Sequence, residues 1–71
     1  MNTTIPQILS RYGIARSTYT LRKRGHRERL AFDPYTFELM ATGDVTTIAR
    51  CLRASGVSVR EMGRRSLYVA A

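Results

Sequence analysis

Apolar residues near the N-terminus recur at helical spacing, at Ile5, Ile8, Leu9 and Tyr12. This pattern predicts a short helix. Thr3 or Thr4 can cap it, and Pro6 suits the first turn, where a missing N–H is tolerated. Gly13 then marks the end of the helix, because glycine adopts the left-handed conformation at little cost.

A second helix is predicted over residues 16–24, with Gly25 as its stop signal. Its core-facing side is ambiguous, because Leu21 continues the helical line from Ile14 whereas Tyr19 lies off that line. We expect both Leu21 and Tyr19 to be partly buried. Residues 29–32 follow as a short strand or extended arm.

Two further helices are predicted in the middle of the chain. Asp33 followed by Pro34 is typical of a capped helix start, so a helix is expected over residues 34–42. After Gly43, Asp44 caps a helix over residues 45–55. The core-facing stripe of that helix is Val45, Ile48, Ala49 and Leu52.

From Val57 onward the hydrophobic period changes from 3.6 to 2. Val57 and Val59 alternate with polar residues, and so do Leu67 and Val69. The intervening residues 62–65 contain a glycine, so a β-hairpin is predicted over residues 57–69. The whole chain is therefore expected to form one α+β domain, with four short helices and a C-terminal hairpin.

Positive charge is high and unevenly distributed. The 71 residues include 12 Lys and Arg against 5 Asp and Glu, which gives a net charge of +7. Residues 1–36 carry seven basic and two acidic side chains, net +5, and residues 37–71 carry five and three, net +2. Such a field favours phosphate polymers or anionic membrane surfaces as partners. The partner surface is expected mainly in the first half.

Several function classes are not favoured by the composition. The five acidic residues are scattered and no catalytic or metal-binding motif is present, so neither an enzyme nor a cofactor is expected. The single Cys51 is expected to be a buried structural thiol. No apolar run approaches the roughly 20 residues that span a bilayer, and no secretory signal is evident. We therefore expect a soluble, cytoplasmic protein associated with the nucleoid.

The segment ILSRYGIARSTYTLRKR, residues 8–24, resembles the bacterial helix-turn-helix pattern. Gly13 occupies the turn, an apolar residue follows it, and Thr18-Tyr19 stands where the pattern often has threonine followed by an apolar residue. Leu9 stands where the pattern has a small residue. Ala15 stands where it has a capping serine or threonine.

The order of the expected elements over residues 5–42 is similar to the winged-helix DNA-binding domains of MerR-type regulators and phage excisionases. Phe32-Asp33-Pro34 matches the step that leads from a strand into the next helix of that family. The resemblance implies a small winged helix-turn-helix protein, either a transcriptional regulator or an excisionase-like recombination factor of a phage or mobile element. Its wing is either the basic loop at residues 25–32 or the hairpin at residues 60–66.

Double-stranded DNA is the expected partner, bound by a homodimer or a cooperative array. No membrane or small-molecule partner and no metal are expected. The residues predicted to read bases from the second helix are Arg16, Ser17, Thr20, Lys23 and Arg24. Those predicted to contact the DNA backbone are Arg11, Arg22, His26, Arg27, Arg29, Arg64 and Arg65.

Two other functions fit the same charge pattern. The stronger is a small protein-binding inhibitor or adaptor, such as a phage anti-host factor, whose basic face meets an acidic or nucleic-acid-binding partner. An RNA-binding module is the weaker one, because only Tyr19 offers an aromatic stacking surface near the basic cluster.

Overall fold

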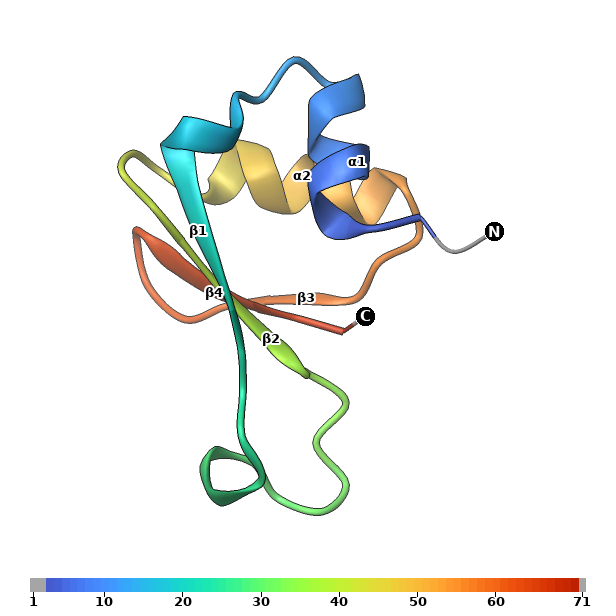
Figure 1. Cartoon of the computed structure of the whole chain (residues 1–71), viewed down its shortest axis with the longest axis vertical. Coiled ribbons are helices and arrows are strands. Elements are labelled where there is room, and N and C mark those ends of the chain that lie inside the picture. The colour runs from blue at the N-terminus through green and yellow to red at the C-terminus, as the bar shows by residue number, and fades with distance from the viewer. Residues whose placement is uncertain (1–2, 71) are drawn as a thin grey trace.

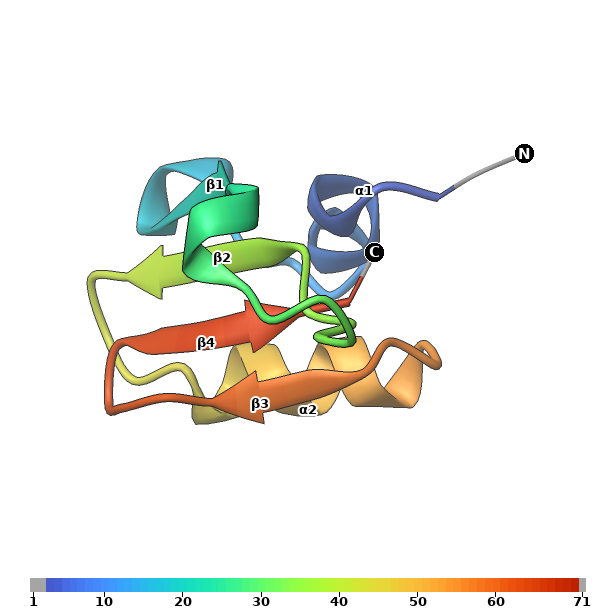
Figure 2. The ribbon, with the colours of Figure 1, turned by 90° about the horizontal axis from the view of Figure 1, so that it is seen from below.

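A computed structural model describes residues 3–70 of the chain. Its elements in order are α1 (Ile5–Arg11), the 3-10 turn η1 (Arg16–Thr18), β1 (Tyr19–Lys23), the 3-10 turn η2 (His26–Glu28), β2 (Phe37–Ala41), α2 (Thr46–Ala54), β3 (Val59–Glu61) and β4 (Ser66–Val69). The four strands form one antiparallel sheet in the order β1-β2-β4-β3 (Figures 1 and 2).

The chain is an α+β domain, but the predicted winged helix-turn-helix with four helices is wrong. Residues 3–70 contain two α-helices and a four-stranded sheet. The predicted helices at residues 16–24 and 34–42 are instead the strands β1 and β2, which pair with each other. The helix-turn-helix expected over residues 5–24 is therefore absent.

The helix predicted over residues 16–24 does not form beyond a single turn at its N-terminal end. Ala15 makes no capping hydrogen bond with its side chain, and only the single 3-10 turn η1 follows it. From Tyr19 the side chains alternate, with Tyr19 buried, Thr20 exposed and Leu21 half-buried. Because Tyr19 pairs with Ala41 of β2, a contact distant in sequence overrides the local helical signal.

The helix predicted after Asp33 is wrong for a similar reason. The Asp33 carboxylate accepts a hydrogen bond from the Tyr35 N–H at 2.8 Å, which closes a turn of the Asx type. The chain then enters β2, where Leu39 is fully buried between the more exposed Glu38 and Met40. The expected extended arm at residues 29–32 is also wrong, because Leu30–Asp33 form a hydrogen-bonded turn.

Both remaining helices were predicted correctly. α1 begins with a capping box, in which the Gln7 N–H donates to Thr4 Oγ1 at 3.3 Å and the Thr4 N–H donates to Gln7 Oε1 at 2.8 Å. Asp44 accepts a hydrogen bond from the Thr46 N–H at the start of α2. The helices are followed by Gly13 and Gly56, both at positive φ.

The predicted C-terminal hairpin is also confirmed. β3 pairs with β4 in the register that places Val59 opposite Val69. β4 then pairs with β2 on its other side, with Leu67 opposite Leu39. The hairpin therefore belongs to the central sheet.

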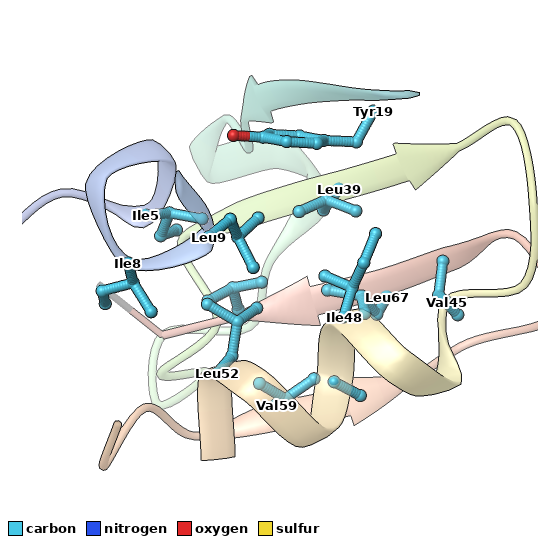
Figure 3. Close-up of a cluster of buried hydrophobic side chains, with 12 residues drawn as sticks. Ile5, Ile8, Leu9, Tyr19, Leu39, Val45, Ile48, Leu52, Val59 and Leu67 are labelled. Carbon is cyan, nitrogen blue, oxygen red and sulfur yellow. The ribbon is translucent and has the colours of Figure 1, made fainter. Parts of the chain in front are cut away.

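One hydrophobic core lies between the two helices and one face of the sheet (Figure 3). Tyr19 is 4% exposed and belongs to this core, whereas Leu21 only packs against its margin. The largest fully buried side chains are Leu9, Leu39, Leu52, Leu67, Val45 and Val69. Leu9 fills the space beneath α1, which explains why a small residue is not required there.

Candidate nucleic-acid interface

The β1–β2 connection, residues 24–36, extends from the end of the sheet away from both helices (Figure 1). We call it the locked loop. It contains η2 and most of the basic cluster that the sequence predicts as a DNA contact.

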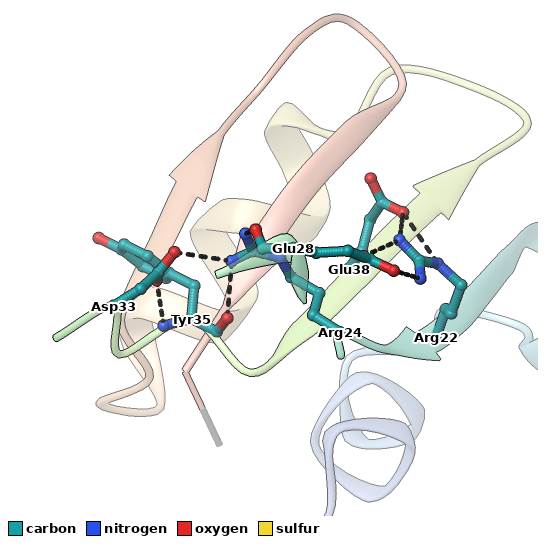
Figure 4. Close-up of polar contacts among 6 residues, drawn as sticks. All are labelled: Arg22, Arg24, Glu28, Asp33, Tyr35 and Glu38. Atoms are coloured by element: carbon teal, nitrogen blue, oxygen red, sulfur yellow. Dashed lines mark hydrogen bonds and ion pairs between the residues drawn. The ribbon is translucent and has the colours of Figure 1, made fainter. Parts of the chain in front are cut away.

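Arg24 fixes the base of the locked loop. Arg24 is 5% exposed, and the central carbon of its guanidinium lies 3.8 Å from the centre of the Tyr68 ring on β4. The same group donates to the Glu28 carbonyl oxygen at 2.8 Å and the Tyr35 carbonyl oxygen at 2.7 Å. It also contacts Asp33 Oδ2 at 3.1 Å (Figure 4). One buried cation therefore joins both arms of the loop to the sheet.

The Asp33 carboxylate is the acceptor at the centre of this arrangement. The hydrogen bond from the Tyr35 N–H lowers the pKa of Asp33 below its ordinary value, and the Arg24 guanidinium lowers it further. Asp33 is therefore charged at neutral pH and holds the second half of the loop against Arg24.

A second ion-pair group supports η2 from the solvent side. Arg22 on β1 forms a two-point contact with Glu28, at 2.8 and 2.9 Å, and also contacts Glu38 on β2 at 2.9 Å (Figure 4). Hydrogen bonding to Glu28 and Glu38 raises the pKa of Arg22, and the bond from Arg22 lowers the pKa of Glu28. Arg22 is thus largely neutralised by protein carboxylates.

The apex of the locked loop is a closed turn with apolar side chains. The Asp33 N–H donates to the Leu30 carbonyl oxygen at 3.0 Å. Leu30 is 66% exposed and Phe32 is 82% exposed, the two largest values among the exposed large hydrophobic residues. An ordered turn therefore holds an aromatic ring in solvent.

Basic side chains lie between the base of the locked loop and this apex. Lys23, His26 and Arg27 are exposed, and Arg29 is half-buried with its Nη1 donating to the Asp33 carbonyl oxygen at 3.3 Å. Within residues 3–70, none of these four side chains forms an ion pair with a carboxylate. The exposed positive charges of Lys23 and Arg27 are therefore available to an external anion, whereas the charge of Arg29 is only partly accessible.

The predicted base-reading residues do not share one surface. Arg24 is buried, which gives it a structural role in place of the expected contact with bases. Arg16 stacks on Tyr19 and donates to its carbonyl oxygen at 2.8 Å. Ser17 lies in η1, Thr20 is an exposed residue of β1, and Lys23 ends that strand.

Three other residues predicted to contact the DNA backbone lie far from the locked loop. Arg64 and Arg65 are exposed in the β3–β4 turn, at the opposite end of the sheet, where they line a shallow hollow with Gly43 and Asp44. Hydrogen bonds from Thr46 and the charge of Arg64 lower the pKa of Asp44. Arg11 lies in the last turn of α1.

Sequence reasoning missed Leu30, Phe32 and Tyr68. The segment Leu30-Ala31-Phe32 directly follows the basic residues 22–29, and this position could have indicated an exposed loop. In the sequence, however, Leu30 and Phe32 looked like strand residues. Tyr68 could not have been found, because its contact with Arg24 requires the unpredicted pairing of β2 with β4.

Other kinds of site receive no support from residues 3–70. These residues contain no group of three His, Cys, Asp or Glu side chains placed to hold a metal ion. None of their helices is long and apolar enough to cross a membrane. Cys51 is half-buried, so its predicted burial is only partial.

No protein-family model matches the chain, and no curated protein or solved structure is significantly similar to it. The resemblance over residues 5–42 to MerR-type regulators and excisionases stays a prediction from the sequence. Function is therefore argued from the geometry and charge of the locked loop.

Proposed function

We propose that this protein binds duplex DNA through the locked loop, as a small regulatory or architectural factor. The observation that supports the proposal most is the distribution of paired and unpaired charge. Glu28, Asp33 and Glu38 neutralise Arg22 and Arg24 at the base of the loop. The exposed Lys23 and Arg27 and the half-buried Arg29 have no such partner among residues 3–70.

Cations carried on an ordered backbone suit a phosphate polymer. Three side chains, Lys23, Arg27 and Arg29, carry full positive charge on or beside the loop. The hydrogen bonds of Arg24 fix the backbone of the loop before binding, so little backbone entropy is lost on contact. Such contacts supply affinity and position but no sequence information. Sequence preference, if present, therefore requires a further contact.

The experiment is a fluorescence-anisotropy titration of the protein into labelled random and A·T-rich duplexes. Three phosphate contacts predict a slope of about −2.7 for log affinity against log salt, or about a 40-fold loss between 50 and 200 mM salt. The absence of binding to any duplex at about 50 mM salt would overturn the proposal.

A matched pair of variants locates the contact. Arg27→Ala removes an exposed cation of the loop and is expected to weaken binding to all duplexes alike, with a salt slope shallower by about 1. Arg50→Ala removes the same charge from the exposed surface of α2, away from the loop, and is expected to leave the slope unchanged. Equal effects of the two variants would contradict binding through the loop.

A protein-binding inhibitor or adaptor is the second candidate, favoured by the exposure of Leu30 and Phe32. It predicts one stoichiometric protein partner in a pull-down, with binding lost in a Phe32→Ala variant. It also predicts little affinity for duplex DNA, so the anisotropy titration separates the two candidates.

A further inference from the structure

Exposure of Phe32 is unusual enough to require a physical reason. Single apolar residues are common on protein surfaces, but here Phe32 at 82% and Leu30 at 66% lie in the same hydrogen-bonded turn of a projecting loop. Neither side chain belongs to the core or to the structural group around Arg24. Both are therefore free to enter a partner.

We propose that Phe32, with Leu30 beside it, acts as a wedge that inserts between base pairs of duplex DNA and kinks the duplex. This inference rests on the proposed function and names the chemistry of the contact. Apolar side chains that enter from the minor groove partly unstack a base step and bend the duplex. An aromatic ring compensates for part of the lost stacking, because every base presents a π face.

The backbone beneath the wedge is fixed before binding. The turn from Leu30 to Asp33 is closed by a hydrogen bond of 3.0 Å, and Asp33 is tied to the Tyr35 N–H at 2.8 Å and to Arg24 at 3.1 Å. Pro34 restricts the backbone immediately after the turn. A wedge held in this way loses little entropy on insertion.

Positively charged side chains near the wedge favour a phosphate polymer as the partner. Arg27 is exposed on η2, and Arg29 spans the turn through its bond to the Asp33 carbonyl oxygen. Lys23 is exposed at the end of β1, next to the base of the loop. The locked loop and its base therefore combine an aromatic ring with cations that can contact DNA phosphates.

The apolar apex by itself is too small for a stable protein or membrane interface. A stable protein interface buries about 800 Å² on each partner, whereas one aromatic side chain contributes roughly 150–250 Å². A myristoyl chain alone gives only marginal membrane binding, so the Leu30 and Phe32 side chains would give weaker binding still. A single base step, in contrast, accommodates one ring.

A Phe32→Trp variant tests the wedge directly, because the chain contains no tryptophan. We expect its fluorescence to be quenched on addition of a 30-base-pair duplex, since the indole would stack on bases. Met40→Trp is the control. Met40 is 54% exposed on β2, outside the loop, and a tryptophan there is expected to remain unquenched. A blue shift with anionic phosphatidylserine vesicles, without quenching by DNA, would overturn the wedge in favour of a membrane contact.

Binding and bending measurements separate this inference from the proposed function. Phe32→Ala is expected to weaken duplex binding about 10-fold with an unchanged salt slope, and to abolish the bend seen by energy transfer between labelled duplex ends. Met40→Ala is expected to change neither. If the wild-type protein binds DNA without bending it, and DNA does not quench the Phe32→Trp variant, the wedge is wrong and DNA binding stands. If the wild-type protein does not bind DNA, both are wrong.

Discussion

Arg24 orders the locked loop through contacts that differ in kind. Its planar guanidinium donates to two carbonyl oxygens and a carboxylate while one face covers the Tyr68 ring. The group is nonetheless imperfectly satisfied, because Arg24 Nε is buried without a hydrogen-bond partner among residues 3–70. Removing a donor group of this kind leaves several acceptors unpaired, so the residue is expected to be sensitive to substitution.

An Arg24→Met variant is expected to destabilise the protein by about 2–4 kcal/mol, since it leaves Asp33 Oδ2 and two carbonyl oxygens without the Arg24 donor. Urea unfolding followed by circular dichroism measures this change. The control is Arg27→Met, an exposed position for which a change within about 0.5 kcal/mol is expected. Equal stability of the two variants would contradict the role of Arg24.

Acid is expected to weaken the same group. The pKa of Asp33 is lowered in the folded state from its ordinary value of 3.8, so its contribution to stability is complete above that value. It is lost as the pH falls through the folded-state pKa. Asp33→Asn keeps an acceptor for the Tyr35 N–H but cannot titrate. The thermal unfolding midpoint of this variant is therefore expected to depend less on pH than that of the wild type, between about pH 5 and pH 2. Parallel curves for wild type and variant would contradict this assignment.

At the level of elements, the sequence predicts those parts whose signals are local. The capping box of α1, Asp44 before α2 and the alternation in the last strand pair all lie within a few residues of the elements they specify. β1 and β2 were predicted as helices because their pairing joins residues about 20 positions apart, such as Tyr19 and Ala41. Helical spacing in a short apolar run does not exclude a strand.

Helix ends provide a test at this scale. Gly13 has φ of +76° and Gly56 has φ of +84°, and an added Cβ would meet nothing within 4 Å at either position. Alanine there is expected to destabilise by about 1 kcal/mol through backbone strain alone. Gly43→Ala is the control, since Gly43 has an open surrounding and no positive φ; its unfolding free energy is expected to stay equal or rise. A Gly43→Ala loss as large as that of Gly56→Ala would contradict the argument.

On the scale of the whole molecule, the two ends of the sheet have different properties. One end carries the locked loop with its apolar apex, and the other carries Arg64 and Arg65 beside Asp44.

The sequence shows the concentration of charge at residues 22–29, and it predicts Arg24 as a base-reading residue. The burial of Arg24 could not be predicted, because it depends on the whole sheet. Dimerisation stays a prediction.

The most direct measurement is a map of amide chemical-shift changes when a ¹⁵N-labelled sample is titrated with a short duplex. Binding through the locked loop predicts that the largest changes fall within residues 23–36, with those of α2 unaffected. Changes concentrated in α1, α2 or the turn at Arg64 and Arg65, or the absence of any change at low salt, would contradict the assignment of the DNA-binding surface to the locked loop.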